Sequence, residues 1–415
     1  MNIENATKIL LIALKWVFIC ILIGTISGAA SAFFLVVLDR VTYCREQNNW
    51  LIWLLPIGGL LIGFGYHYLG KSVVKGNNLL LEEYQNPQKM IPLKMVPLVL
   101  FGTLITHLFG GSAGREGTAV QMGGTIADQF TRIFKLDTTD RKTILILGIS
   151  AGFASVFGTP SAGALFALEV LFFSKISFKS IPLSFLTAYI AYFTVAFWHV
   201  KHTHYSIPIL PEISIATLFW ILTVSILFGL AAMLFSRCTH FWSQLFSKYI
   251  SYPPLRPFVG GILLAVAVYL IGTTKYIGLG IPVIVDSFSN PNTAYDFLLK
   301  ILFTGLTLGA GFKGGEVTPL FFVGATLGSG LSLVVPLPIA LLAGMGFVAV
   351  FAGATHTPVA CTVMGMELFG TESGVFIGIA CLIAYFSSGS VGIYNAQIEK
   401  GAKFHLYKKV GKGDS

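Results

Sequence analysis

The stretch that decides the fold reads Gly111-Ser112-Ala113-Gly114-Arg115-Glu116-Gly117-Thr118, an Arg-Glu pair between glycines. It lies in a chain of 415 residues of which 55% are hydrophobic and only 11% are charged. With a mean hydropathy of +0.79, the chain carries more apolar surface than a soluble core of this size would bury. We therefore predict an all-α polytopic membrane protein, in which Glu116 is an intramembrane carboxylate and a candidate functional residue.

The same motif returns in the second half of the chain. Residues 114–118 are matched by Gly314-Gly315-Glu316-Val317-Thr318, which lie 200 residues later. Further matches follow in the same order, and they pair 152–157 with 346–351 and 159–162 with 357–360. Seven residues after the last alanine of each final segment stands a glutamate, Glu169 or Glu367. We therefore predict a duplicated fold, although sequence similarity alone leaves open whether the repeat is parallel or inverted.

The apolar runs divide into long and short ones. Runs that span a membrane, or nearly so, lie at 9–37, 50–69, 92–109, 143–158, 182–199, 214–235, 257–273, 296–310, 334–352 and 372–388. Shorter runs that begin at Gly or Pro lie near 118–134, 161–173, 318–332 and 358–369. Short interrupted segments at matching places in two halves are typical of broken helices that meet at an ion site. The alternative is that the glycines only allow helices to pack closely.

Charge and loop composition divide the chain into parts. We predict a first half over 1–200, a connecting loop over 201–212, a second half over 213–399 and a basic tail over 400–415 with no regulatory domain. By the positive-inside rule, the tail lysines place the C-terminus in the cytoplasm; they are Lys400, Lys403, Lys408, Lys409 and Lys412. The same rule indicates cytoplasmic loops at Arg132, Lys135, Arg141, Lys142, Lys175 and Lys179. The net charge of +9 therefore needs no nucleic-acid partner.

The sequence offers no pattern for a metal, a cofactor or an enzyme. The cysteines lack ligand spacing and are interpreted as packing residues; they are Cys20, Cys44, Cys238, Cys361 and Cys381. His202 and His204 have no carboxylate or thiol beside them, so we interpret them as solvated loop residues. The first apolar run lacks a basic flank and a cleavage site, and we interpret it as a retained helix.

The glycines around Glu116 and Glu316 favour helices that begin inside the membrane. The start of such a helix exposes unpaired N–H groups and the positive end of its dipole, which together bind anions. Gly114 and Gly117 allow the backbone to approach an ion closely. Pro319 suits a first helical turn, where no N–H is needed.

Glu116 can itself occupy such an anion site. An external anion that displaces the carboxylate leaves it in a dry environment, where it takes up a proton. One residue then serves as both gate and proton carrier. The alternative is a permanent Arg115–Glu116 salt bridge that holds a loop, although a buried pair with a purely structural role is costly.

These motifs resemble those of the CLC family of anion channels and proton-coupled antiporters. Residues 114–118 are similar to the family's Gly-Arg-Glu-Gly-Pro segment, and 314–319 to its Gly-x-Phe-x-Pro segment. Tyr394, after Gly392-Ile393, resembles the family's central anion-coordinating tyrosine. The resemblance covers nearly the whole chain. It implies a CLC-type inverted repeat of tilted and broken helices, a homodimer, and one anion pathway per subunit.

Several positions depart from the pattern of chloride-handling members. Thr118 replaces a proline, and Asn77 stands in place of the anion-coordinating serine. Glu316 and Val317 stand where an aliphatic residue and phenylalanine are usual. Val170 takes the place of the inner proton-handling glutamate, one position after Glu169. The usual second proton station is therefore missing.

These departures resemble the bacterial fluoride/proton antiporters of the family. Fluoride is small and strongly hydrated, and an asparagine amide offers it two N–H donors where serine offers one. Glu316 would then replace the missing proton station, and Thr318 would pass protons or contact the ion. Two other interpretations stay open, since Asn77 also suits a helix N-cap and Glu316 suits a partner of Lys313.

We therefore expect a secondary transporter that exports fluoride in exchange for protons and protects a bacterial cell from fluoride. The alternatives are a chloride/proton antiporter and a passive anion channel of the same fold. The resemblance implies a homodimer surrounded by lipid in the inner membrane, with fluoride and protons as its only other partners. The expected gating and proton residues are Glu116, Glu316 and Thr318, and the expected anion-binding residues are Asn77, Gly114, Arg115, Gly117, Val317 and Tyr394.

Overall fold

A computed structural model describes residues 3–171, 177–398, 403–404 and 407. Over these residues the protein is helical, with one isolated β-bridge, and the all-α prediction is confirmed. The elements in chain order are α1 (Ile3–Gln47), η1 (Asn49–Leu54), α2 (Leu55–Tyr68), η2 (Lys71–Val73), α3 (Asn77–Gln85), α4 (Met95–Leu108), α5 (Glu116–Ile133), α6 (Thr138–Phe157), α7 (Pro160–Val170), α8 (Ser180–Phe197), α9 (Ile215–Tyr249), α10 (Leu255–Ile271), α11 (Ile281–Asp286), α12 (Asp296–Gly309), α13 (Val317–Leu331), α14 (Ile339–Thr355), α15 (Pro358–Phe369), η4 (Thr371–Ser373) and α16 (Gly374–Ser387).

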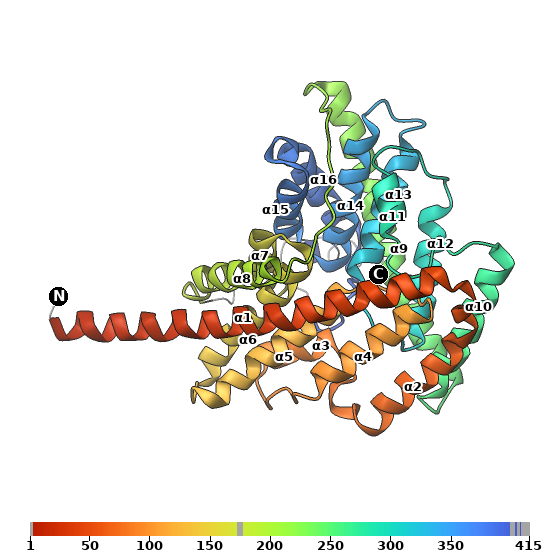
Figure 1. Ribbon diagram of the computed structural model, residues 1–415. Coiled ribbons are helices and arrows are strands. Elements are labelled where there is room, and N and C mark those ends of the chain that lie inside the picture. The colour runs from red at the N-terminus through yellow and green to blue at the C-terminus, as the bar shows by residue number, and fades with distance from the viewer. Residues whose placement is uncertain (1–2, 172–176, 399–402, 405–406, 408–415) are drawn as a thin grey trace, which may run out of the picture.

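The long helices have apolar surfaces that no other described part of the chain covers. In α1, Ile9 and Leu11 are 58% and 61% exposed, whereas Ile19 and Ile23 are fully buried. The N-terminal part of α1 extends beyond the helical body (Figure 1). Within the described residues, four helices are long and apolar enough to cross a membrane, namely Thr7–Gln47, Asn49–Tyr68, Ser180–Phe197 and Ile215–Tyr249. This exposed apolar surface fits a lipid environment.

The helix pairs α5–α6 and α13–α14 form the centre of the two halves, and glycines set how closely they pack. A Cβ at Gly324 would lie 1.9 Å from the carbonyl oxygen of Gly346 on α14. In α5, a Cβ at Gly123 would lie 2.4 Å from the carbonyl oxygen of Gly148 on α6. At these positions the helices meet backbone to backbone, so the close-packing interpretation holds for these glycines.

The two short helices α7 and α15 exchange caps. Glu169, at the end of α7, accepts hydrogen bonds from Val359 N at 3.0 Å and Ala360 N at 2.7 Å, at the start of α15. Glu367, near the end of α15, accepts from Ser161 N and Ala162 N, both at 2.9 Å, at the start of α7. Each glutamate therefore satisfies the unpaired N–H groups at the first turn of the other helix.

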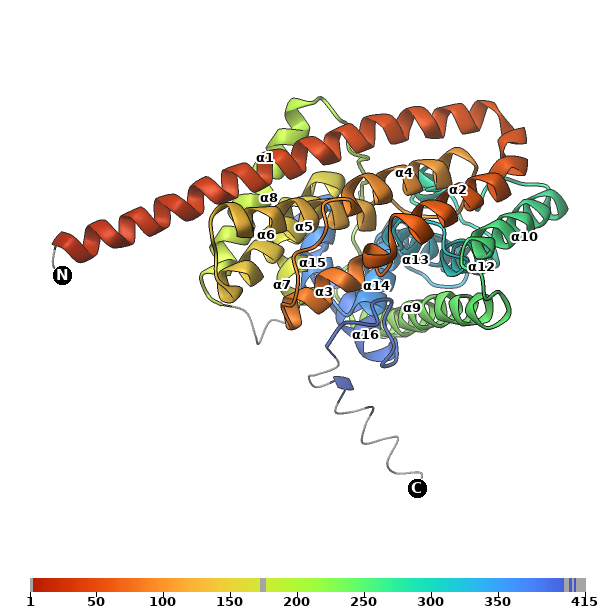
Figure 2. The same ribbon diagram turned by 90° about the horizontal axis from the view of Figure 1, so that it is seen from below.

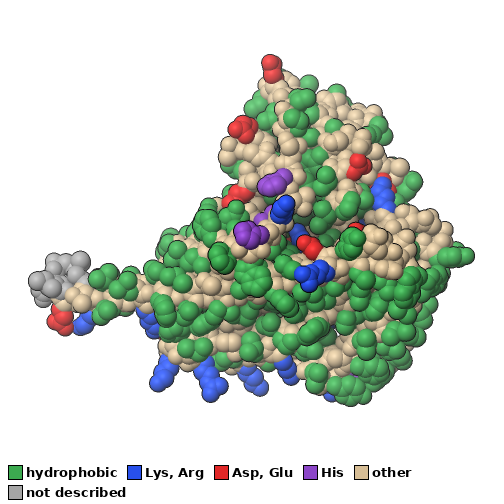
Figure 3. Space-filling model, in the orientation of Figure 1, with side chains coloured by type: hydrophobic (Ala, Val, Ile, Leu, Met, Phe, Trp, Pro, Cys, Tyr) green, Lys and Arg blue, Asp and Glu red, His purple; other side chains and the backbone are tan. Residues whose placement is uncertain are grey.

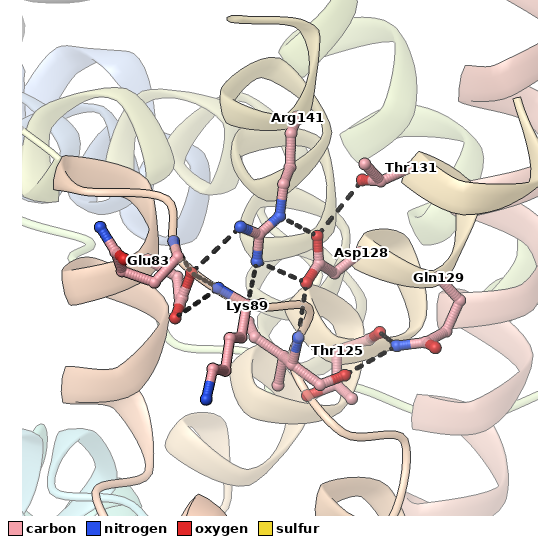
Figure 4. A network of polar contacts seen from close by, with 9 residues as sticks. Glu83, Lys89, Thr125, Asp128, Gln129, Thr131 and Arg141 are labelled. Carbon is pink, nitrogen blue, oxygen red and sulfur yellow. Dashed lines mark hydrogen bonds and ion pairs between the residues drawn. The ribbon is translucent and has the colours of Figure 1, made fainter. Parts of the chain in front are cut away.

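A buried ionic network joins α3, α5 and α6 (Figure 4). The guanidinium of Arg141 on α6 donates to both carboxylate oxygens of Asp128 on α5, at 2.7 and 2.9 Å. It also donates to Glu83 on α3 at 3.0 Å and to the carbonyl oxygen of Lys89 at 2.7 Å. Because α3 begins at Asn77, the network anchors the far end of the helix that carries this predicted site residue.

The chain between α8 and α9 contains no helix and crosses one face of the molecule, while residues 390–398 lie at the opposite face (Figure 2). This segment includes the predicted connecting loop 201–212. Tyr205 packs its ring against Phe288 and Phe347, with centroids 5.2 Å apart in each case. The interpretation of His202 as solvated is wrong, because its ring lies against Gly158 and its Nε2 is buried, whereas His204 is exposed.

One lysine of the predicted basic tail is buried. Lys403 is fully buried, donates to Ser388 Oγ at 2.8 Å and lies over the ring of Tyr385. Its long apolar stem allows a lysine to pack in this way while the ammonium keeps a polar partner. Lys175, Lys400, Lys408, Lys409 and Lys412 lie outside the described residues.

Candidate anion and proton site

The two glycine motifs meet each other directly. Gly114 N donates to Gly315 O at 2.6 Å and Gly315 N donates to Gly114 O at 2.7 Å, which forms an antiparallel bridge between the halves. A side chain at Gly315 would collide with α5, because a Cβ there would lie 2.7 Å from Gly117 N. Gly314 has φ +153°, in the region that favours glycine. The glycines therefore bring the starts of α5 and α13 together.

The carboxylate of Glu116 lies at the first turn of the opposite helix. It is 1% exposed and accepts from Thr318 N at 3.1 Å and from Thr318 Oγ1 at 2.5 Å. Arg115 N donates a further bond at 3.1 Å. Glu116 begins α5, so a residue of the first half occupies the N-terminus of α13 in the second half. A helix N-terminus with N–H and O–H donors is a binding place for an anion.

Arg115 lies beside Glu116 without closing a hydrogen-bonded salt bridge. Its Nε is 3.7 Å from Glu116 Oε1, which is beyond hydrogen-bond length, and Nε is buried without a hydrogen-bond partner among the described residues. The alternative of a tight structural pair is therefore weakened. The polar bonds of the carboxylate come mainly from Thr318.

A small cavity of about 30 Å³ leads to Glu116 from the face crossed by the α8–α9 segment. Arg115 and Thr318 line it, together with His202 and Tyr205 of that segment. In Figure 3, histidine, basic and acidic side chains gather in a notch near the centre of the face shown. His202 and Tyr205 are thus functional candidates that sequence reasoning missed, since no local motif connects them with Glu116.

Glu316 and Asn77 approach the start of α5 from the other side. A Cβ at Gly117 would lie 3.0 Å from Asn77 Nδ2 and 3.6 Å from Glu316 Oε2. Asn77 Oδ1 and Glu316 Oε2 are both buried and have no hydrogen-bond partner in the part of the chain that the structure describes. Asn77 is the first residue of α3, and the N-cap position of that helix is Gly76. Unpaired buried polar atoms of this kind are costly unless a ligand or proton completes them.

Lys313 is not an ion-pair partner of Glu316 in this structure. Its Nζ lies over the ring of Tyr66, 4.0 Å from the centroid. The two charges still interact through space, but no salt bridge joins them within the described residues.

Tyr394 lies at the same end of the site as Asn77. It is 7% exposed and lies within electrostatic range of both Glu316 and Glu116. Asn78 Oδ1 accepts from Ala396 N at 3.0 Å, which ties the start of α3 to the segment that carries Tyr394. A cavity of about 70 Å³ beside Tyr394 opens at this end, opposite the Glu116 cavity.

Three other positions from the sequence have local roles. Thr118 shares a hydrogen bond of 2.7 Å with Thr103 on α4, so the residue that replaces a proline joins two helices. Val317 is the buried first residue of α13. Val170 is a buried core residue at the end of α7, beside the capping glutamate Glu169.

Two buried basic residues support the glycine motifs, and sequence reasoning passed over both. His107 on α4 is 1% exposed, with Nε2 3.5 Å from the carbonyl oxygen of Gly114. Lys300 on α12 is fully buried and donates to the carbonyl oxygens of Tyr276 and Gly278 at 3.1 and 2.9 Å. The signal for Lys300 was a single lysine within the apolar run 296–310.

The arrangement is chemically suited to exchange an anion for a carboxylate. The positive ends of two helices face each other from opposite halves, and one of them is already occupied by Glu116. A free anion that takes this place would meet the same N–H and O–H donors. The displaced carboxylate would then favour its protonated form in an apolar environment.

Comparisons with known proteins agree with this geometry. A family model described as voltage gated chloride channel matches residues 58–389. A protein of Pseudomonas syringae pv. tomato named chloride/fluoride channel protein is 50% identical over 397 residues, which cover 94% of this chain and 88% of that protein. The solved structure of a CLC-type fluoride/proton antiporter is 36% identical with a TM-score of 0.90, covering 93% of this chain and 98% of its own. A slow cyanobacterial Cl⁻/H⁺ antiporter shares the fold at 18% identity, with a TM-score of 0.80 and coverage of 97% and 99%.

Proposed function

This chain belongs to the CLC family of voltage-gated chloride channels and antiporters, and on that premise we propose that it exports fluoride in exchange for protons. The observation that carries the proposal is the carboxylate of Glu116 at the N-terminus of α13, held by Thr318 N and Thr318 Oγ1. This carboxylate occupies a place that an anion would fill. Fluoride is favoured over chloride because the donors approach closely and the related antiporter is named for fluoride.

In the proposed cycle Glu116 moves one proton for each displacement. Fluoride that arrives from the Tyr394 side replaces the carboxylate at Thr318, and the displaced carboxylate binds a proton. When Glu116 returns to Thr318 it releases that proton, because the N–H and O–H donors stabilise the charged form. Fluoride and proton therefore compete for one place and move in opposite directions. This role makes the protein a transporter rather than an enzyme.

Asn77 and Glu316 complete the proposed path. The Asn77 amide would donate to fluoride near the start of α5, beside Gly117. Glu316, whose Oε2 is buried without a hydrogen-bond partner in the described chain, would hold the proton that the absent carboxylate at Val170 would otherwise carry. Arg115 and Val317 would contribute backbone donors and positive charge, whereas Gly114, whose N–H is bonded to Gly315 O, would let the backbone approach the ion closely.

The proposal extends to assembly and location. We place the protein in the inner membrane of a bacterium as a homodimer, with residues 390–398 on the cytoplasmic face. The small cavity at Glu116 then opens to the outside. The named relative from Pseudomonas syringae supports a bacterial setting.

Reconstituted liposomes test the function. We expect fluoride efflux, followed with a fluoride electrode, to drive measurable proton uptake, and chloride to move far more slowly. Glu116→Gln removes the titratable group while keeping its size, so we expect proton uptake to disappear. Chloride efflux as fast as fluoride efflux would favour the chloride antiporter instead, and proton uptake that persists in Glu116→Gln would remove Glu116 from the central role.

A further inference from the structure

A groove beside α2 and α10 is lined by several basic side chains. It lies where α2 packs against α10, at one end of the molecule (Figures 1 and 2). The groove has a volume of about 390 Å³, and among the described residues its lining includes no carboxylate and four basic residues, which are His67, Lys71, Arg256 and Lys313. We propose that this groove binds the phosphate headgroup of an anionic phospholipid. The proposed function is needed to say which leaflet supplies the lipid and how the lipid affects transport. The binding of the lipid does not depend on the proposed function.

The innermost cation of the groove needs an anionic partner. Lys313 Nζ lies over the Tyr66 ring, yet no oxygen of the described residues accepts a hydrogen bond from it. The lysine stem is held tightly, because a Cβ at Gly102 would lie 2.9 Å from Lys313 Cγ. The ammonium is thus fixed with three hydrogen-bond donors available. A phosphate oxygen at the groove would satisfy them.

A mainly apolar cavity, with Lys94 as a charged residue in its lining, adjoins the groove and suits acyl chains. A second cavity of about 490 Å³ shares Ile62 and Tyr66 with the groove, and its lining includes Leu61, Leu98 and Phe101. Both volumes lie in the range of small-molecule sites. The charged groove and the apolar cavity both contact Tyr66, so the groove can hold a lipid headgroup while the cavity holds its acyl chains.

Aromatic residues place the groove at the level of lipid headgroups. Tyr68 is 68% exposed, Tyr252 is 40% exposed and Phe64 is 39% exposed, and their rings cluster with His67 beside the groove. Exposed tyrosines gather at membrane–water interfaces. Lys71 lies six residues before Asn77, on the side of the Tyr394 segment, so the lipid comes from the proposed cytoplasmic leaflet. Basic pockets between helices on that side suit anionic headgroups.

The site is connected to the proposed transport path through the backbone. Lys313 directly precedes Gly314 and Gly315, which bridge to Gly114, and stands three residues before Glu316. A phosphate bound to the Lys313 ammonium therefore adds a contact next to the segment that carries Glu316. We expect fluoride exchange to be faster in membranes that contain the anionic lipid.

Native mass spectrometry of the purified full-length protein tests the site directly. Phosphatidylglycerol and phosphatidylcholine with identical acyl chains are added at equal concentration, and we expect selective retention of phosphatidylglycerol. Lys71→Ala and Lys313→Met should each reduce that selectivity about fivefold. Lys15→Ala removes an exposed lysine of α1 outside the groove and should leave it unchanged. Equal retention of both lipids, or full selectivity in Lys71→Ala, would overturn the proposal.

A liposome assay separates this inference from the proposed function. Fluoride efflux is compared in phosphatidylcholine vesicles with and without phosphatidylglycerol, for the wild type and Lys71→Ala. We expect the anionic lipid to accelerate wild-type efflux and to have a smaller effect on the variant. If the protein retains phosphatidylglycerol selectively but shows no fluoride efflux, the proposed function is wrong and the lipid site remains supported. An equal acceleration in both proteins would contradict the connection between the site and transport.

Discussion

Glu116 receives two of its hydrogen bonds from Thr318, a residue of the other half of the chain. The sequence pointed to Glu116 through its glycines, but the motif did not indicate which helix the carboxylate would cap. These partners lie 202 residues apart in the sequence, and the bridge between Gly114 and Gly315 helps to bring them together. For the same reason His202 was interpreted as a solvated residue, because its contact with Gly158 is visible only in the folded structure.

The Thr318 hydroxyl offers a test of the proposed gate. Thr318→Val removes the 2.5 Å bond to Glu116 Oε1 and keeps the side-chain volume. A hydrogen bond to a charged group contributes about 1.5 to 3 kcal/mol, so the carboxylate should leave its place more readily. We expect fluoride to pass with fewer protons, measured as the proton-to-fluoride ratio in liposomes. Thr118→Val is the matched control and should keep the wild-type ratio, because Thr118 bonds to Thr103 instead. An unchanged ratio in Thr318→Val would count against the gate.

Glu169 is expected to act on stability rather than on protons. Both of its oxygens accept hydrogen bonds from the N–H groups of Val359 and Ala360, which stabilise the charged carboxylate as a helix cap. Glu169→Gln should therefore keep proton coupling but lower stability by about 1 to 3 kcal/mol, because a charge-assisted cap is lost. Thermal unfolding in detergent measures the loss, and Glu367→Gln should behave in the same way. Lost proton coupling in Glu169→Gln would assign this residue to the proton path.

At the scale of elements, the helices follow the sequence where Gly and Pro mark their ends. The short helices α5, α7, α13 and α15 begin within two residues of the predicted starts at 118, 161, 318 and 358. The helix α3 is absent from the predicted apolar runs because residues 77–85 form a short segment of low hydrophobicity, and only the N-cap interpretation of Asn77 pointed to a helix there. The helix α1 extends to Gln47, beyond the predicted run 9–37, because charged residues continue a helix that leaves the apolar layer.

The ionic network between α3, α5 and α6 should be important for stability. Arg141→Met leaves the carboxylates of Asp128 and Glu83 buried without their cation, and breaking a buried pair costs about 3 to 5 kcal/mol. We expect a marked fall in the thermal unfolding temperature of the purified protein. Arg132→Met, an exposed arginine of α5, is the control and should have little effect. A variant Arg141→Met as stable as the wild type would mean that the network contributes nothing net.

At the scale of the whole molecule, the two halves depend on each other. The fold class and the duplication were predictable because repeated motifs survive in the sequence. The contacts between halves were not, since the same hydrophobic pattern is compatible with several packings of helices in a membrane. The caps exchanged by α7 and α15 and the bridge at Gly315 each join a residue that precedes the connecting loop in the sequence to a residue that follows it.

Separate expression of the halves tests this dependence. A fragment over 1–200 and one over 201–415, produced together in one cell, should purify as a complex and restore fluoride resistance. Either fragment alone should be unstable, because helix N–H groups buried in lipid stay unpaired. Copurification of an affinity-tagged fragment with its partner measures the outcome. A single fragment that folds and exports fluoride would show that the halves are independent.

The exchanged caps also set an order of events during synthesis. Ser161 receives its cap from Glu367, which the ribosome adds 206 residues later. At about 5 to 20 residues per second, the start of α7 waits roughly 10 to 40 s in the membrane with its amides uncapped. During that interval the uncapped N–H groups need other hydrogen-bond partners, which the insertion machinery or water at the helix end can provide. We therefore expect the chain to be most susceptible to quality-control proteases after the first half has been made and before Glu367 has been added.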